Sequence, residues 1–191
     1  MAPLVDFIGD VASRTAGEPL ERMRHDASRD RDYEIDAHWA LYVENYLEGF
    51  HIPFVHPGLN QVVDYSSYSS ELFRYSNVQL AQSRDGAPAA QYWWIFPNLM
   101  LNFYPWGLSL NLVQPQAAGR TRIAFRAFVA DASQLASGAG AALDRVEEED
   151  EAIVLAVQRG VKSRLYTGGR YSPTRERGVH QFHRLLCEFL A

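Results

Sequence analysis

The feature that most constrains the fold is a central block of strand-like segments separated by turns. The segments are rich in aromatic and β-branched residues and read SSYSSELFRYSNVQLAQS, QYWWIFPNLMLNFYP, LSLNLVQP and RTRIAFRAFVAD. The turns SRDGAPA and PQAAGR separate them in the manner of a meander. This pattern predicts an antiparallel sheet of about five to seven strands.

Helical patterns flank this block on both sides. Apolar residues at helical spacing predict a first helix from Trp39 to about His51, with Asp36 as its N-cap. A second helix is expected to begin near Leu143, and a third at the C-terminus, with Pro173 at its start. Helix, sheet and long helices in this order predict an α+β fold in which a curved antiparallel sheet grips a helix.

Composition limits the domain count and the partners. The 191 residues are 47% apolar, which suffices for one core, so we expect an irregular leader over residues 1–30 and one domain over residues 31–191. The formal charge of −5 is spread along the chain, so neither nucleic acid nor a membrane is an expected partner. No segment resembles a membrane helix or a signal peptide, which favours a cytoplasmic protein.

The single cysteine, Cys187, also limits the chemistry. One cysteine excludes an intrachain disulfide, a zinc ribbon and a cysteine-ligated iron–sulfur cluster within this chain. We expect Cys187 to be a small buried hydrophobe of the C-terminal helix.

The second predicted helix carries a carboxylate on its apolar face. Position 150 continues the apolar stripe, so Asp150 is expected to point inward, where an unpaired carboxylate is costly. It therefore needs a partner, either a metal ion or an arginine such as Arg122 or Arg126. The neighbouring glutamates are expected to lie mostly on the solvent-facing flank; they are Glu147, Glu148, Glu149 and Glu151.

The stretch ENYLEGFHIPFVHPG, residues 44–58, supplies two histidines on either side of a proline. His51 closes the first helix, and Pro53 prevents its continuation, so His56 lies on the following loop and can converge with His51. Glu48 lies one turn before His51, where its carboxylate can accept the ring proton of the histidine and decide which nitrogen is free.

Two histidines and one carboxylate from a separate helix are the ligand set typical of non-heme Fe(II) oxygenases. That set leaves coordination positions open for dioxygen and substrate. Zinc fits the same ligand types, and Glu48 could then serve a hydrolase as general base. Ligand types alone leave both metals open.

Three segments, in this order, resemble the catalytic domain of the alpha subunit of Rieske-type ring-hydroxylating oxygenases. They are HWALYVENYLEGFHIPFVHPGL, WWIFPNLMLNFYP and EEEDEAIVLAVQRGVKSRLYTGGRYSPTRERGVHQFHRLL. The resemblance covers nearly all of residues 31–191 and implies a helix-grip domain of the START-like (SRPBCC) type. It also implies that the metal is Fe(II) and that His51, His56 and Asp150 are its ligands.

The resemblance further implies partners. Members of the family act on a small organic molecule with O2 and take electrons from a Rieske [2Fe-2S] cluster. This chain cannot ligate such a cluster, so the cluster must belong to a separate Rieske protein or domain, fed by a ferredoxin or reductase. Glu48 stands where the family has an acidic residue that bridges to the Rieske cluster of a neighbouring subunit, which implies a homotrimer. A glutamate here resembles the choline- and carnitine-oxidising branch.

Aromatic residues are dense enough to line a substrate chamber beside the metal. Such a chamber would accept a flat ring, or a quaternary ammonium through cation–π contact. The expected substrate contacts are Asn45, Phe54, Trp94 and Phe96. The alternative is a helix-grip binding module that holds a hydrophobic ligand without redox chemistry.

Overall fold

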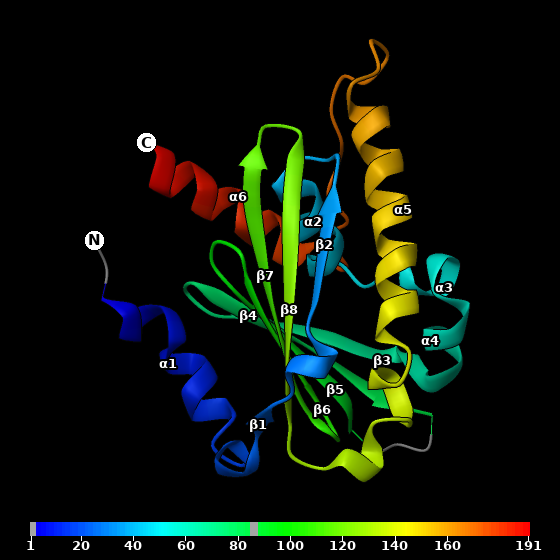
Figure 1. Ribbon diagram of the computed structural model, residues 1–191. Helices are drawn as coiled ribbons and strands as arrows, with labels where there is room; N and C mark the ends of the chain where they lie inside the picture. Colours follow the sequence, from blue (N-terminus) through cyan, green and yellow to red (C-terminus); the bar gives the residue numbers. More distant parts are fainter. Residues whose placement is uncertain (1–2, 85–87) are drawn as a thin grey trace.

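The computed structural model describes residues 3–84 and 88–191 and shows one curved sheet with helices on both of its faces (Figure 1). The strands are β1 Arg24–His25, β2 Arg31–Ile35, β3 Val63–Leu72, β4 Ser76–Ser83, β5 Pro88–Ile95, β6 Leu99–Tyr104, β7 Gly107–Ala117 and β8 Arg120–Val129. The α-helices are α1 Leu4–Arg14, α2 Trp39–Leu47, α3 Ile52–Val55, α4 Pro57–Val62, α5 Leu143–Val161 and α6 Arg177–Leu190. The predicted α+β fold with an antiparallel sheet is confirmed.

The sheet is an antiparallel meander extended at one edge. Its order is β1-β8-β7-β6-β5-β4-β3, and β2 also pairs with β8. The central block supplies the six strands from β3 to β8, and the two N-terminal strands raise the total to eight in the described residues, above the expected range. Strand β2 was missed because its residues are mostly charged, and pairing with β8 decides its conformation. The predicted turn SRDGAPA includes residues 85–87, which lie outside the described residues.

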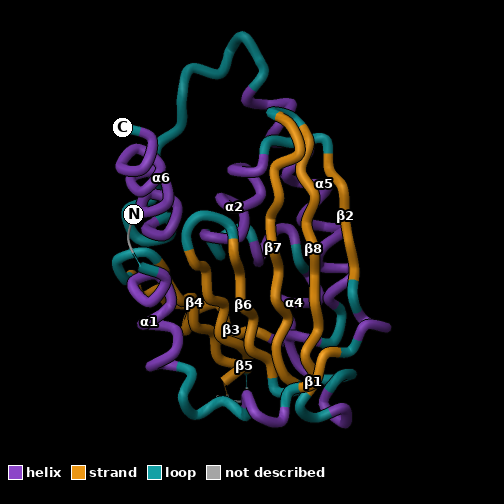
Figure 2. The backbone as a smooth tube through the Cα atoms, turned by 60° about the vertical axis from the view of Figure 1, so that its left-hand side comes forward, coloured by secondary structure: helices purple, strands orange, loops and turns teal. Residues whose placement is uncertain are grey.

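Successive side chains along each strand point to opposite faces of the sheet, and helices cover both faces. Trp94 points toward the helices, where its ring packs edge-on against Phe182 of α6 with the centroids 5.6 Å apart. The adjacent Trp93 points to the other face and packs in a cluster with Val11 of α1. In Figure 2, α2, α4 and α5 lie behind β6, β7 and β8. The site described below lies on this helix-covered face.

Helix α1 replaces the irregular leader expected for residues 1–30. Phe7, Ile8 and Val11 recur at helical spacing and pack against Trp93 and the other apolar side chains on the outer face of the sheet. Covering that face removes apolar surface from water, which stabilises the helix. The described part of this segment, residues 3–30, thus includes a helix that contributes to the core, and the expectation of an irregular segment is corrected there.

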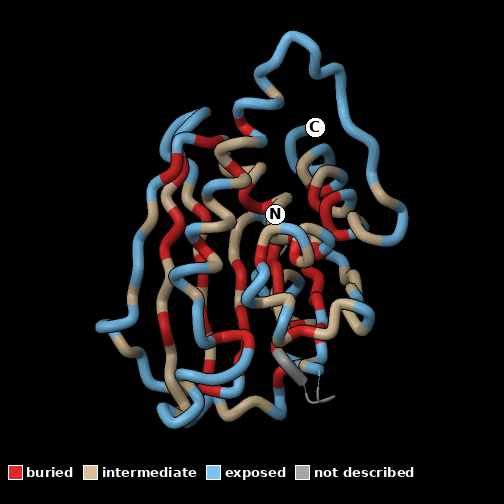
Figure 3. The backbone as a smooth tube through the Cα atoms, turned by 90° about the vertical axis from the view of Figure 1, so that its right-hand side faces the viewer, coloured by how far each residue is buried: buried red, intermediate tan, exposed pale blue. Residues whose placement is uncertain are grey.

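The C-terminal helix begins later than predicted. A turn over residues 172–176 precedes α6, because the Glu176 N–H donates to the Ser172 carbonyl at 3.0 Å. The helix therefore starts at Arg177, and Pro173 lies within the preceding turn. Cys187 is exposed, contrary to expectation, because it lies on the outer side of α6. In Figure 3 the connection between α5 and α6 is exposed over residues 162–171.

The first predicted helix ends at Leu47 instead of His51. Its N-cap is His38 rather than Asp36, with the ring Nδ1 accepting from the Ala40 N–H at 3.3 Å. Glu48 adopts an extended backbone conformation, and Gly49 follows it at a point where a Cβ would lie 2.2 Å from Cζ of Tyr68. The close approach of Tyr68 therefore requires glycine at this position. Among the described residues, no helix is long and apolar enough to cross a bilayer.

Replacing Gly49 tests this close approach. We expect Gly49→Ala to lower the free energy of unfolding by about 1–3 kcal/mol, because the added methyl overpacks against the Tyr68 ring. Urea unfolding followed by circular dichroism measures the change. Gly58→Ala is the control, since no heavy atom lies within 4 Å of its added Cβ. Equal stability of the two variants would contradict the argument.

Candidate metal centre

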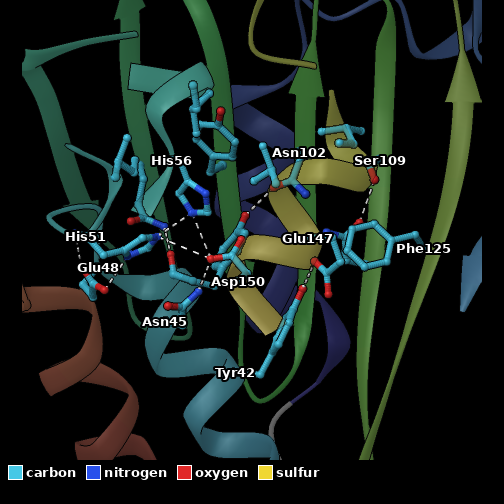
Figure 4. A pocket seen from close by; sticks show the side chains of 18 of the residues that line it. Tyr42, Asn45, Glu48, His51, His56, Asn102, Ser109, Phe125, Glu147 and Asp150 are labelled. Atoms are coloured by element: carbon cyan, nitrogen blue, oxygen red, sulfur yellow. Dashed lines mark hydrogen bonds and ion pairs between the residues drawn. The ribbon is translucent and has the colours of Figure 1, made fainter. Parts of the chain in front are cut away.

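Three ligand atoms converge between α5 and the two short helices that follow α2 (Figure 4). His51 Nε2 lies 3.2 Å from His56 Nε2, His56 Nε2 lies 3.1 Å from Asp150 Oδ1, and His51 Nε2 lies 3.6 Å from Asp150 Oδ1. Ligand atoms about 2.1 Å from a metal on adjacent octahedral corners lie about 3 Å apart. The three residues that the sequence singled out are therefore spaced to hold one metal ion.

The helix is broken before His51 and again at His56, and these two breaks bring the two histidines together. His51 is the N-cap of α3, and His56 lies at the junction of α3 and α4, where Pro57 occupies the first turn of the next helix. Pro53 in the first turn of α3 and Pro57 in α4 both favour a helix start. The predicted loop position of His56 is thus a junction between two helices of four and six residues.

Carboxylates orient both imidazole rings. His51 Nδ1 donates to Glu48 Oε1 at 2.5 Å, and the same carboxylate accepts the His51 backbone N–H at 3.2 Å. His56 Nδ1 donates to Glu149 Oε2 at 2.8 Å. With each Nδ1 carrying the proton, both Nε2 lone pairs face the common point, as a metal requires. Glu149 is a residue of the site that the sequence reading placed on the solvent flank.

Contacts with carboxylates shift the pKa of His56, and the contact with His56 shifts the pKa of Glu149. Burial lowers the pKa of His56, but the Asp150 and Glu149 carboxylates outweigh it, and the pKa lies above its ordinary value. The hydrogen bond from His56 holds the pKa of Glu149 below its usual range. The two unprotonated Nε2 atoms would repel each other at 3.2 Å. A cation at their meeting point removes that repulsion.

The alternative partners of Asp150 are engaged elsewhere. Arg122 pairs with Asp32 at 2.9 Å, and Arg126 pairs with the same carboxylate at 3.1 Å. Asp150 instead accepts from Asn45 Nδ2 at 2.6 Å, so this predicted contact residue lies at the site and holds the Asp150 carboxylate. Among the residues that the structure describes, no arginine pairs with Asp150.

A cavity of about 110 Å³ opens beside the three ligand atoms. A row of polar side chains crosses its floor, because Gln79, Tyr92, Asn102 and Ser109 are paired in register on β4, β5, β6 and β7. Aromatic walls come mostly from tyrosines: Tyr42, Tyr46, Tyr68, Tyr92 and Tyr104, with Phe125. The predicted substrate contacts did not include these tyrosines, although Tyr92 shares the sheet face of Trp94 by simple alternation.

Three predicted substrate contacts lie away from this cavity. Phe54 projects from α3 into solvent and is 85% exposed. Trp94 is fully buried against Phe182, and Phe96 packs on Phe189 with the ring centroids 4.8 Å apart. The expectation that these side chains line the chamber is corrected, because the two buried rings fill the core beneath α6.

A family model described as "Ring hydroxylating alpha subunit (catalytic domain)" matches residues 20–89 and 69–191. The chain belongs to this family. It is 33% identical to the chloroplastic choline monooxygenase of Arabidopsis thaliana over 171 residues, 82% of this chain and 40% of that protein. It is 28% identical to the carnitine monooxygenase oxygenase subunit of Escherichia coli strain K12 over 174 residues, 80% of this chain and 46% of that protein.

Solved structures of a Rieske monooxygenase and of a naphthalene dioxygenase share the fold. A structure of the quaternary ammonium Rieske monooxygenase CntA superposes with a TM-score of 0.82 at 23% identity, covering 98% of this chain and 56% of that one. Naphthalene 1,2-dioxygenase gives a TM-score of 0.71 at 14% identity, covering 97% of this chain and 59% of that one. The chain thus spans less than half the length of the two curated relatives above, and it matches their catalytic-domain family.

Removing the hydrogen-bond acceptor of His56 tests the role of Glu149. We expect Glu149→Gln to weaken binding of a divalent metal by about 10–100-fold, because the ring loses the carboxylate that orients it and raises its basicity. Competition with a chromophoric chelator measures the dissociation constant. Glu148→Gln, at the exposed neighbouring position, is the matched control. Identical affinities for both variants would show that Glu149 does not support the metal ligands.

Proposed function

We propose that this chain is the mononuclear iron domain of a Rieske-type oxygenase and that His51, His56 and Asp150 hold Fe(II). The spacing of 3.1–3.6 Å among the three ligand atoms is the observation that carries the proposal. Membership of the ring-hydroxylating catalytic-domain family favours iron over zinc. Fe(II) held by three protein atoms keeps open positions for O2 and supplies the oxygen-activating chemistry.

The protein residues prepare this site in separate ways. Glu48 and Glu149 hold the proton on each Nδ1, so both Nε2 atoms stay available to the metal. Asn45 holds Asp150 Oδ1 and thereby limits rotation of that carboxylate. The tyrosine walls lower the local dielectric around the cavity, which strengthens the electrostatic interactions there.

Electrons must come from a [2Fe-2S] cluster outside this chain, since a single cysteine cannot build one. We infer that a Rieske protein or domain delivers them near Glu48. This side chain is 14% exposed and is hydrogen-bonded to His51, so it links the surface to a metal ligand. Delivery from a neighbouring subunit would make the working assembly a homotrimer.

The substrate we propose is a small organic molecule, either aromatic or a quaternary amine. The tyrosine walls suit both, because an aromatic ring stacks on them and a cation binds their π faces. The names of the choline and carnitine monooxygenases favour an amine. One or two oxygen atoms would be inserted next to the metal.

Metal analysis tests the proposal. Protein purified without oxygen is expected to contain about one iron per chain, and Asp150→Ala is expected to lose it, because one of three ligands is gone. Elemental analysis gives the stoichiometry, and circular dichroism checks that the variant stays folded. Zinc under metal-replete growth would favour a hydrolase, and no metal would favour a binding module.

Turnover provides the second measurement. With O2 and a Rieske electron donor, the iron-loaded chain is expected to form a hydroxylated product, whereas Asp150→Ala is expected to form none. Oxygen consumption that is equal in both proteins would show that the three-ligand site is not the site of oxygenation.

A further inference from the structure

Glu147 is a buried carboxylate that the metal site does not use. It lies on α5 three residues before Asp150 and is only 4% exposed, whereas the sequence placed it on the solvent flank. Tyr42 donates its hydroxyl to Glu147 Oε2 at 2.6 Å. Oε1 has no hydrogen-bond partner in the described structure. A buried carboxylate oxygen without a donor is costly, so its retention calls for a ligand.

The other polar groups of the cavity are already engaged. Tyr46 donates to Asn102 Oδ1 at 2.6 Å, and Ser109 donates to Asn111 Oδ1 at 2.7 Å. Among the described residues that line the cavity, Oε1 of Glu147 is the buried side-chain polar atom that lacks a partner. Oε1 of Glu147 is thus a hydrogen-bond acceptor for which a ligand could supply the donor.

The negative charge of the cavity favours a hydrogen-bond donor that is positively charged. Its described lining contains the carboxylates of Glu48, Glu147 and Asp150 and no lysine or arginine. Glu48 contacts His51, and Asp150 contacts His56, so a metal ion and the histidines account for these two acids. Within this cavity Glu147 is left without a cation, whereas Arg29, Arg31 and Arg145 line a second cavity on which it also borders. Burial, together with the nearby Asp150 carboxylate, raises its pKa, and a bound cation would oppose that shift.

Glu147 is also one of the residues that line the metal cavity. It borders the metal cavity and a second cavity of about 340 Å³, and both are lined by Ser109, Phe125 and Leu143 as well. In Figure 4 Asp150 extends from α5 toward the histidines, whereas Glu147 extends toward Tyr42 and Phe125.

We propose that Glu147 binds the ammonium group of the substrate, and that this ammonium still carries an N–H. The inference rests on the proposed oxygenase function of the same cavity, and it replaces the quaternary amine named there with an amine that keeps an N–H. A protonated primary, secondary or tertiary amine supplies both the positive charge and the hydrogen that Oε1 lacks. A quaternary ammonium supplies the charge alone and leaves Oε1 unsatisfied. In Figure 4 the Phe125 ring lies beside Glu147, where it can add a cation–π contact.

The distance to the metal ligands suits a short substrate. Residues 147 and 150 are separated by about 4.5 Å along the helix axis. An amine held at Glu147 therefore places the carbon atoms of a short chain beside His51, His56 and Asp150. Glu147 would set which molecule enters and which carbon atom faces the metal.

Binding of a matched pair of probes tests the inference without turnover. Isothermal titration calorimetry of the full metal-loaded chain under nitrogen compares butylammonium with butyltrimethylammonium, which differ in the N–H groups. We expect the wild-type protein to bind butylammonium at least about tenfold more tightly. Equal affinity, a preference for the quaternary probe, or no binding of either at millimolar concentration would overturn the proposal.

Three variants locate the effect in Glu147. Glu147→Gln keeps the shape of the side chain and is expected to weaken butylammonium binding at least about tenfold, with a much smaller change for the quaternary probe. Glu148→Gln, an exposed neighbour, is expected to change neither. An unchanged preference in Glu147→Gln would overturn the proposal. Tyr42→Phe, which keeps the carboxylate, is expected to retain the preference even if Glu147→Gln does not fold.

The outcome separates this inference from the proposed function. Binding of butylammonium through Glu147 in a chain that takes up no iron would leave the inference standing and remove the oxygenase. An iron-loaded chain that hydroxylates a substrate but shows no preference between the probes would support the oxygenase and overturn the role of Glu147.

Discussion

The packing of α5 against α2 is the interaction on which the rest of the site depends. Tyr42 and Asn45 lie one turn apart on α2 and bond Glu147 and Asp150, which lie one turn apart on α5. These contacts join segments 105 residues apart and hold two carboxylates below the surface of the domain. Without this crossing, both acids would face water, and neither a metal ion nor a ligand ammonium would be needed to balance them.

A concentration of negative charge follows from that packing. Glu48, Glu149 and Asp150 surround two histidines, and Glu147 lies close by. Like charges in a partly desolvated site repel, so such a cluster persists only where cations offset it. The histidine rings offset part of it. A divalent metal and a cationic substrate would offset the remainder, so one electrostatic requirement links the metal site and the substrate cavity.

The face of the sheet beneath these helices is apolar at both ends and polar in the middle. At one end Trp94, Met100 and Ile123 pack against α2 and α6, and at the other Tyr104 and Trp106 pack in a second cluster. Between them the in-register row Gln79, Tyr92, Asn102 and Ser109 leaves room for a cavity with polar groups on its floor. The two apolar ends anchor the helices, and the polar middle forms the floor of the cavity.

The sequence by itself determined the features that depend on local pattern. Alternation and turn residues predicted the strands of the central block, and the prolines around His51 and His56 with the interruption at Asp150 predicted that these three side chains could converge. Only the tertiary structure decided which side chains are covered. In the run EEEDE, helical spacing alone could not separate the buried Glu147 from the exposed Glu148, because burial depends on α2 crossing that face. Phe54 and Trp94 were misplaced for the same reason, since a side chain lines a cavity only where distant segments leave space.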